Sequence, residues 1–356
     1  MAQVIGRTED GDSGEAYAMT LAAIAYCSDI PTALQQNAPM WKPAWIPDQE
    51  VNGNFAYVAY SGQQYVVAIR GSVLSFSWES FQDWFEQDFN VLYQSPWTYT
   101  DDANGAQTSR GAADGLSDLT SLVSTVGGKQ VRLLDFLMDN AVANEIPIAV
   151  TGHSLGGGLA TVFAPWLQYQ ITTAGKTVPG LVVMTFAAPA VGNQAFAQAY
   201  DAMFGANAWR FYNELDIVPM ASASITDMAN LYPAPLQASQ ITATYDIDGY
   251  SVTASLWDAI YALAATVDAS ELYYSSWYTQ TNAAVGSVPL NQSGELSLVT
   301  SDDPLVEWLE QAGGQHSVAM YLQQLGAPVF TCPSSLAEPS TTPAIIQEAA
   351  AAPEVP

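Results

Sequence analysis

One serine in this chain has the surroundings of a nucleophile. Ser154 stands in Gly152-His153-Ser154-Leu155-Gly156, a G-x-S-x-G motif that follows the apolar run 148–150 and precedes a helical pattern. In a nucleophile elbow, a sharp strand-to-helix turn pushes the serine hydroxyl out at the top of a sheet. Glycines flank it because side chains there would clash. The motif predicts a nucleophilic Ser154, although an ordinary turn would also match the pattern.

A serine hydroxyl needs a general base, and the chain has two histidines from which to choose one. His153 is adjacent to Ser154, and adjacent side chains on a strand point to opposite faces. His316 lies in Gly313-Gly314-Gln315-His316-Ser317, which we expect to be a glycine-bearing turn that runs into a helix over 318–325. We therefore predict that His316 is the base; the alternative is a surface histidine that caps this helix.

A carboxylate should orient the base, and Asp216 is the best-placed candidate. It lies in Asn213-Glu214-Leu215-Asp216-Ile217-Val218-Pro219, just beyond a predicted strand over 209–213. The other candidates have local explanations as a mid-helix residue, hairpin-turn residues or a helix cap: Asp201, Asp246, Asp248, Asp302 and Asp303. The order Ser154, Asp216, His316 is that of the α/β-hydrolases and differs from the two best-known serine protease folds.

Strands that alternate with helices must position these residues. Strands are predicted over 55–60, 65–69, 181–186 and 209–213 and for the apolar run that begins at 148 and ends in the G-x-S-x-G motif. Helices are predicted over 15–28, 155–173 (with Pro165 as a kink) and 194–204. This alternation predicts a mainly parallel sheet with helices on both faces, whose chemistry gathers at the carboxyl ends of the strands. Loops are expected over 31–47 and 94–115, a broken helix over 116–143, and a hairpin over 241–245 and 250–253.

Composition excludes several classes of function. The 356 residues have a formal charge of −27, from 35 acidic and only 8 basic residues. Such a surface repels nucleic acid and anionic membranes. No apolar run is long enough to cross a bilayer, and the first residues lack the pattern of a signal peptide, so we expect a mature or intracellular chain. The many aromatic residues suit apolar or carbohydrate substrates, or simply a large core.

Two features of the chain leave alternatives open. Cys27 and Cys332 could be buried free thiols, or they could join the two ends of the globular region in an oxidising compartment. An aromatic segment over 73–89 has acidic residues between its apolar ones, which is typical of an amphipathic helix that either moves or packs permanently on the core. Its apolar stripe includes Trp78, Phe81, Trp84 and Phe85.

Several motifs in the same order resemble the class 3 lipases, the family of fungal triacylglycerol lipases and related feruloyl esterases. The resemblance covers most of residues 15–332 and rests on the motifs Ile69-Arg70-Gly71-Ser72, 150–157, 185–193 and 213–219. It implies an α/β-hydrolase fold with Ser154, Asp216 and His316 as the catalytic triad. It further implies an oxyanion hole formed by Ser72 and the Leu155 amide, a Cys27–Cys332 disulfide, a lid over 73–89, and no metal or cofactor.

These observations together predict a serine carboxylic-ester hydrolase, with a triacylglycerol lipase as the first hypothesis. A feruloyl or short-chain esterase with the same triad is the alternative, and a catalytically silent binding homologue is a third hypothesis. We expect a loose arm over 1–14, a catalytic domain over 15–332 and a disordered tail over 333–356. The catalytic domain would carry an aromatic insertion over about 235–300 above the acyl site. The expected partners are a neutral lipid or ester and a lipid–water interface, without a protein partner, and the expected location is extracellular.

Overall fold

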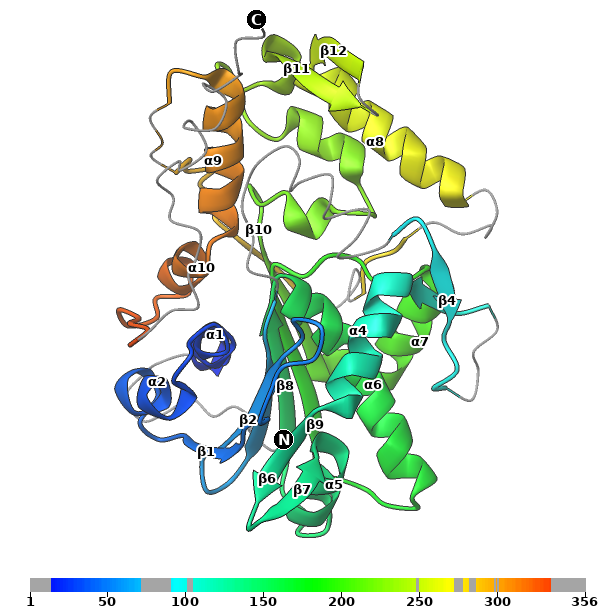
Figure 1. Cartoon of the computed structure of the whole chain (residues 1–356), viewed down its shortest axis with the longest axis vertical. Helices are drawn as coiled ribbons and strands as arrows, with labels where there is room; N and C mark the ends of the chain where they lie inside the picture. Colours follow the sequence, from blue (N-terminus) through cyan, green and yellow to red (C-terminus); the bar gives the residue numbers. More distant parts are fainter. Residues whose placement is uncertain are drawn as a thin grey trace, which may run out of the picture.

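A seven-stranded sheet forms the centre of the molecule (Figure 1). The computed structural model describes residues 14–71, 91–100, 105–247, 250–271, 278–281, 286–297, 299 and 301–333. The strand order is β1 (Lys42–Trp45), β2 (Ala56–Tyr60), β3 (Tyr65–Ile69), β8 (Ile148–His153), β9 (Leu181–Phe186), β10 (Ala208–Asn213) and β13 (Ser287–Leu290). The first three strands pair antiparallel and all later pairs are parallel, which confirms the predicted mainly parallel sheet.

Helices cover both faces of this sheet, so its central strands are apolar on both sides. In β3 every residue is buried, and successive residues alternate between the two faces. Val67 and Ile69 pack with the core under α4 (Arg110–Ser121) and α6 (Leu155–Thr173), whereas Val66 and Ala68 pack with the core under α2 (Ile30–Asn37). Further helices beside the sheet are α1 (Gly14–Ile24), α5 (Leu133–Leu137), α7 (Gln194–Phe204) and α10 (Val318–Gln324).

A second lobe is formed between the predicted acid and the predicted base, and it has its own hydrophobic core. It contains α9 (Pro304–His316), α8 (Leu256–Glu271) and the hairpin of β11 (Thr242–Ile247) and β12 (Tyr250–Ser255), all of which lie above the sheet in Figure 1. Short helices η4 (Val218–Met220), η5 (Ile225–Asn230) and η6 (Ala238–Gln240) complete it. The core of this lobe includes Leu215, Ile217 and Trp308.

Several predicted boundaries were wrong. The segment 31–47 is not a loop, because it contains α2 and β1, and the first helix ends at Ile24 rather than at 28. The segment 94–115 contains β4 (Gln94–Pro96), β5 (Gln107–Ser109) and the start of α4. The expected broken helix over 116–143 is instead α4, the hairpin of β6 (Val123–Val126) and β7 (Lys129–Arg132), α5 and η2 (Met138–Val142). Gly127 and Gly128 form the hairpin turn with φ of 58° and 77°, which two-residue hairpin turns require.

Other sequence predictions agree with the structure. The helices α6 and α7 have the predicted bounds, and Pro165 lies inside α6. The hairpin of β11 and β12 is present, and Asp303 caps α9 by accepting from the amides of Leu305 and Val306. The short helix η3 (Gly205–Asn207) follows α7.

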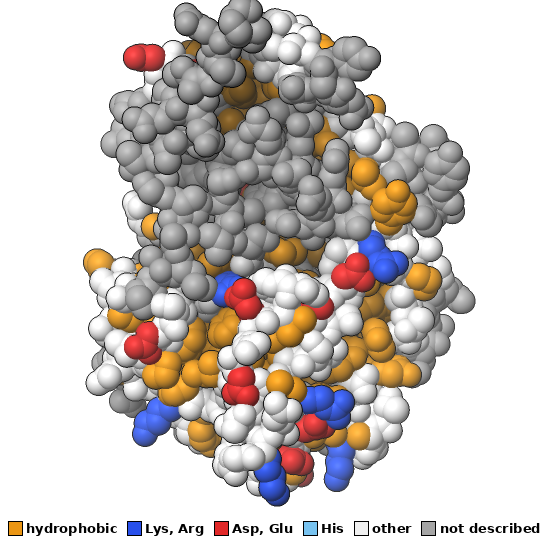
Figure 2. Space-filling model, viewed as in Figure 1, with side chains coloured by type: hydrophobic (Ala, Val, Ile, Leu, Met, Phe, Trp, Pro, Cys, Tyr) orange, Lys and Arg blue, Asp and Glu red, His pale blue; other side chains and the backbone are white. Residues whose placement is uncertain are grey.

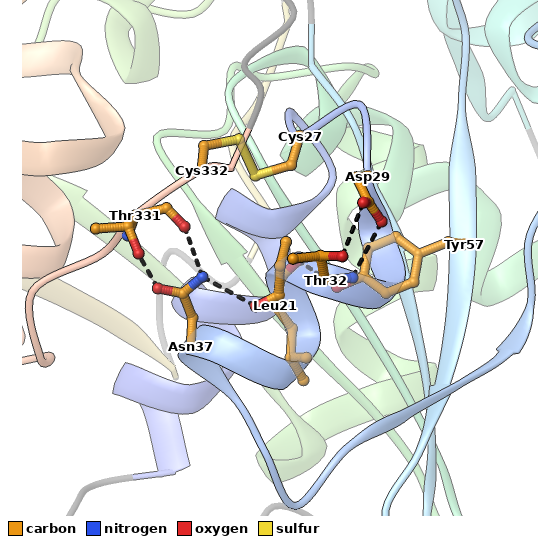
Figure 3. Close-up of a disulfide and its surroundings, with 9 residues drawn as sticks. Leu21, Cys27, Asp29, Thr32, Asn37, Tyr57, Thr331 and Cys332 are labelled. Atoms are coloured by element: carbon orange, nitrogen blue, oxygen red, sulfur yellow. Dashed lines mark hydrogen bonds between the residues drawn. A yellow bond between two sulfur atoms is a disulfide. The ribbon is translucent and has the colours of Figure 1, made fainter.

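The two ends of the described chain are joined near α2 (Figure 3). Cys27 and Cys332 form a disulfide across a sequence separation of 305 residues. Asn37 adds a two-hydrogen-bond clamp, because its amide donates to the carbonyl of Thr331 at 2.7 Å and accepts from the amide of Thr331 at 2.9 Å. The expected lid, most of the expected arm and the expected tail lie outside the described residues. Among those that are described, no helix is both long and apolar enough to span a membrane.

Candidate active site

The predicted nucleophile lies on a strained turn between β8 and α6. Ser154 has φ of 61° and ψ of −132°, a conformation that residues with a side chain rarely adopt and that is typical of functional turns. The flanking glycines have a steric cause. A Cβ on Gly152 would collide with the backbone of Gly156, and a Cβ on Gly156 would collide with the carbonyl of Ile69 on β3. The G-x-S-x-G spacing therefore lets α6 begin in close contact with the sheet.

The structure brings Ser154, His316 and Asp216 together in one hydrogen-bonded line. His316 Nε2 lies 2.8 Å from Ser154 Oγ, and His316 Nδ1 lies 2.8 Å from Asp216 Oδ2. All three residues are buried, with exposed fractions of 1%, 3% and 0%. A neutral imidazole in this position donates from Nδ1 to the carboxylate and accepts at Nε2 from the serine hydroxyl.

His316 is not on a glycine-bearing turn, contrary to the sequence prediction. It is the last residue of α9, and Gly313 and Gly314 lie inside that helix. Space explains one of these glycines, since a Cβ on Gly314 would approach the side chain of Ser297 within 3.0 Å. The following helix α10 begins at Val318, as predicted.

The acid Asp216 is held by two hydrogen bonds besides that of the histidine. Its Oδ1 accepts from the amide of Val218 at 2.9 Å, and its Oδ2 accepts from the hydroxyl of Tyr321 at 2.8 Å. The Tyr321 hydroxyl in turn accepts from the amide of Asn213 at 2.9 Å. Burial and the neighbouring Asp216 raise the pKa of Tyr321 well above its usual value, so this phenol remains a donor. Sequence patterning places Tyr321 on the apolar face of a helix and gives no sign of this contact.

The second histidine, His153, contacts the backbone of His316. His153 Nε2 lies 2.9 Å from the backbone carbonyl of His316, and the two rings are 4.8 Å apart between centroids. Its Nδ1 lies 3.2 Å from the hydroxyl of Tyr26. Burial, and then the nearby His316, hold the pKa of His153 well below its usual value. A neutral His153 that donates from Nε2 to the carbonyl of His316 and accepts at Nδ1 from the hydroxyl of Tyr26 fits these partners.

One of the two predicted oxyanion donors lies within the described residues. Leu155 is the first residue of α6, where backbone amides have no partner within the helix, so its amide can serve an incoming oxygen. Ser72, the other predicted donor, and the lid residues Trp78, Phe81, Trp84 and Phe85 lie outside the described residues. Gly71, just before Ser72, lies so close to the Tyr26 hydroxyl and the His153 carbonyl that no side chain would fit.

The arrangement is suited to proton transfer from a serine during attack on a carbonyl carbon. Among the residues that the structure describes, no group of three or more His, Cys, Asp or Glu could hold a metal ion.

Comparisons with known proteins agree with the motifs. The family described as lipase (class 3) matches residues 66–225. Phospholipase A1-IIalpha of Arabidopsis thaliana is 28% identical over 209 residues, which cover 54% of this chain and 47% of that protein. Lipase ZK262.3 of Caenorhabditis elegans is 34% identical over 87 residues, or 24% of each protein. The chain thus spans less than half the length of these two relatives.

A solved structure extends the likeness to most of the fold. The crystal structure of M37 lipase matches with a TM-score of 0.67 at 24% identity, and the match covers 88% of this chain and 93% of that one. This similarity shows the fold alone, which is that of the α/β-hydrolases, as the order of the motifs predicts.

Proposed function

We propose that this protein is a serine carboxylic-ester hydrolase, because residues 66–225 match the family described as lipase (class 3), in agreement with the resemblance of the motifs. The observation that carries the proposal is the unbroken line of hydrogen bonds from Ser154 through His316 to Asp216. An ordinary strand-to-helix turn would not require a buried histidine at the serine hydroxyl, nor a buried carboxylate behind that histidine. A silent binding homologue would have no need of either hydrogen bond.

The proposed reaction has two stages. Ser154 Oγ attacks the ester carbonyl while His316 Nε2 takes its proton, and Asp216 stabilises the imidazolium that forms. The leaving alcohol departs with the proton from His316, and water then releases the acid from the acyl-enzyme by the reverse sequence of proton transfers. The Leu155 amide, together with Ser72, is proposed to bind the developing oxyanion; each such donor typically contributes about 3 to 4 kcal/mol.

The proposed substrate is a triacylglycerol at a lipid–water interface. One feature of this chain supports a neutral ester: the excess of 27 negative charges disfavours anionic surfaces. Leu155 packs against the core of the second lobe as well as against the main core, so we propose that the insertion over about 235–300 borders the acyl site. The aromatic segment over 73–89 remains the proposed lid.

Two other substrate classes remain alternatives. The name of the relative phospholipase A1-IIalpha favours a phospholipid ester. A feruloyl or short-chain ester would use the same triad without needing an interface. The disulfide between Cys27 and Cys332 supports the further proposal that the protein is secreted, because such bonds persist in oxidising compartments.

Hydrolysis rates on a panel of esters test this proposal. We expect the parent to hydrolyse a triacylglycerol emulsion faster than phosphatidylcholine vesicles, soluble p-nitrophenyl butyrate or methyl ferulate, and its rate to rise as a sparingly soluble ester passes its solubility limit. Ser154→Ala, with an unchanged circular dichroism spectrum, should remove all of these activities. A parent with no activity on any ester would contradict the proposal, and simple saturation without a rise would move the function toward an esterase.

A further inference from the structure

The proposed acid and base come from distant parts of the chain and from different structural units. Asp216 follows β10 of the sheet, whereas His316 ends α9, 100 residues later, and the residues between them build the core of the second lobe. Their hydrogen bond of 2.8 Å nevertheless has to persist. A further contact between the end of β10 and the end of α9 would hold His316 in place relative to Asp216.

Such a contact lies next to both residues and consists of two buried amides. Asn213 is the last residue of β10, and Gln315 immediately precedes His316; their exposed fractions are 1% and 0%. Asn213 Nδ2 donates to the backbone carbonyl of Gln315 at 2.9 Å and to its side-chain Oε1 at 2.6 Å. Asn213 Oδ1 accepts from the amide of Leu215 at 3.0 Å and so also shapes the turn that carries Asp216.

The same glutamine reaches a third segment, at the end of the insertion. Gln315 Nε2 donates to the carbonyl of Glu295 at 3.1 Å, and its Oε1 also accepts from Asn291 Nδ2 at a longer 3.4 Å. Asn291 directly follows β13, whose last residue Leu290 pairs with Asn213 on β10. The side chain of Gln315 therefore connects the end of β10, which precedes Asp216, with the loop that follows β13, at the end of the helix that carries His316.

Amides are suited to this place because they both donate and accept without carrying a charge. A carboxylate at Gln315 would place a second negative charge near Asp216, and an ammonium group would compete for that carboxylate. Fully satisfied buried networks of this kind specify a single geometry, since leaving any member without its partner is costly.

From these contacts we infer that Gln315, paired with Asn213, is a positioning residue that holds His316 in reach of Asp216 and Ser154. This inference rests on the proposed ester hydrolysis. Gln315 does not touch the reacting atoms; it acts by fixing the backbone of the residue that does. Displacing a catalytic group by about 1 Å can lower a rate by about 100-fold, so losing this contact should reduce kcat and leave KM nearly unchanged.

The chain contains a matched control on the same helix. Gln311 lies one turn before Gln315 on α9 and is also fully buried. Within the described part of the structure, neither Nε2 nor Oε1 of Gln311 has a hydrogen-bond partner. The two glutamines therefore differ in their partners and not in residue type, helix or burial.

The experiment compares Gln315→Met, Gln315→Glu and Gln311→Met with the parent on soluble p-nitrophenyl butyrate. The kcat is taken from the plateau of the pH profile and divided by the number of active sites, counted by complete labelling with a fluorophosphonate. We expect Gln315→Met to lower kcat by about 10- to 100-fold with KM within about twofold. Gln315→Glu should lose at least as much kcat as Gln315→Met, because its carboxylate places a second negative charge near Asp216 and cannot donate to the carbonyl of Glu295. Gln311→Met should have a kcat within about twofold of the parent.

Each outcome decides between a positioning role and a merely structural one. If Gln315→Met unfolds more easily but has the parent's kcat per labelled site, or if Gln311→Met loses as much kcat as Gln315→Met, the positioning role is wrong. A Gln315→Glu variant with the parent's kcat per labelled site would also contradict it, because neither the lost donor nor the added charge would then have moved His316. If the parent itself is neither labelled nor active on esters, the proposed function fails instead.

Discussion

The two histidines of this chain lie in contact but have different surroundings. His316 has a hydrogen-bond partner at each ring nitrogen that belongs to the proposed reaction, Ser154 on one side and Asp216 on the other. His153 has a backbone carbonyl and a tyrosine hydroxyl instead. The sequence alone was enough to choose His316 as the base, because His153 is adjacent to Ser154 and its side chain was expected to point to the opposite face of the strand. The supporting contact of His153 depends on where α9 ends, and sequence patterning placed His316 on a turn.

The buried His153 should make stability depend on pH. Its pKa is lowered in the folded state by burial and by His316, so below its ordinary value of about 6.5 the unfolded chain binds a proton that the folded protein does not. Stability attributable to His153 is therefore present above about pH 6.5 and is lost as the pH falls, by at most about 1.4 kcal/mol per pH unit.

This pH dependence can be measured by urea denaturation between pH 5 and pH 8. The difference in unfolding free energy between the parent and His153→Gln should shrink as the pH falls below about 6.5. Comparison with the variant cancels the carboxylates that titrate in both proteins. Parallel curves for the two proteins over this range would mean that His153 is protonated equally in the folded and unfolded states.

The hydroxyl of Tyr321 should contribute to both rate and stability. Tyr321→Phe removes the donor to Asp216 Oδ2 and leaves the amide of Asn213 without its acceptor. Hydrogen bonds to charged groups contribute roughly 1.5 to 3 kcal/mol, so we expect kcat to fall about tenfold and the unfolding free energy by about 1 to 3 kcal/mol. Steady-state kinetics and urea denaturation check this. A stability loss with an unchanged kcat would assign Tyr321 a purely structural role.

At the scale of elements, the sequence was most informative where a long segment rich in apolar residues is bounded by recognisable turn or cap residues. The helices α6 and α7 and the strand β9 have the predicted bounds because each is such a segment, beside the G-x-S-x-G turn, the cap Asn193 or the turn Ala187-Ala188-Pro189. The hairpin of β6 and β7 was missed because each strand has only four residues, and its pairing comes from a turn rather than from patterning. The strand β13 was missed because its pairing with β10 is a contact between distant segments.

The supporting residues of the site were missed for the same physical reason. Asn213 and Gln315 are 102 residues apart in the sequence, and no period relates them. Asn213 does stand in the motif that carries Asp216, which was the only sequence signal near it. The triad itself could be predicted because each member lies beside a recognisable element end, whereas the groups that hold it are joined only by the tertiary fold.

The disulfide should stabilise the fold by joining the segment between α1 and α2 to the segment after α10 (Figure 3). Cys27→Ser with Cys332→Ser removes a crosslink that closes a loop of about 300 residues. We expect the unfolding free energy to fall by about 2 to 5 kcal/mol. The clamp between Asn37 and Thr331 remains in this variant, so the folded arrangement should persist. Urea denaturation without reductant measures the change, and a midpoint equal to that of the parent would contradict the expectation.

For the whole molecule, the charges are unevenly distributed along the chain. No Lys or Arg follows Arg210, so the second lobe and the segments after it contain acidic residues and no basic ones. On the face seen in Figure 2, the blue Lys and Arg side chains lie in the lower part and at mid-height of the view, beside acidic ones. The end of the molecule that holds α8 and α9 in Figure 1 should therefore repel anionic surfaces more strongly than the other end.

This asymmetry predicts a preference for neutral interfaces. We expect hydrolysis of a triacylglycerol emulsion to slow as an anionic amphiphile is added, and to recover as salt rises from about 0.01 M to about 1 M, since the Debye length then falls from about 30 Å to about 3 Å. Adsorption to the emulsion, measured by depletion from the aqueous phase, should change in parallel. A zwitterionic amphiphile is the control. Equal rates with anionic and zwitterionic additives at low salt would rule out the electrostatic account.

The central claim is that Ser154 is a nucleophile activated by His316, and covalent labelling tests it most directly. The native protein is incubated with a fluorophosphonate and the modified residue is located by peptide mass spectrometry. We predict one label per chain, on Ser154, and a labelling rate that falls by at least about 100-fold in His316→Ala with an unchanged circular dichroism spectrum. A native protein that is not labelled at Ser154, or a His316→Ala variant labelled as fast as the parent, would contradict the claim.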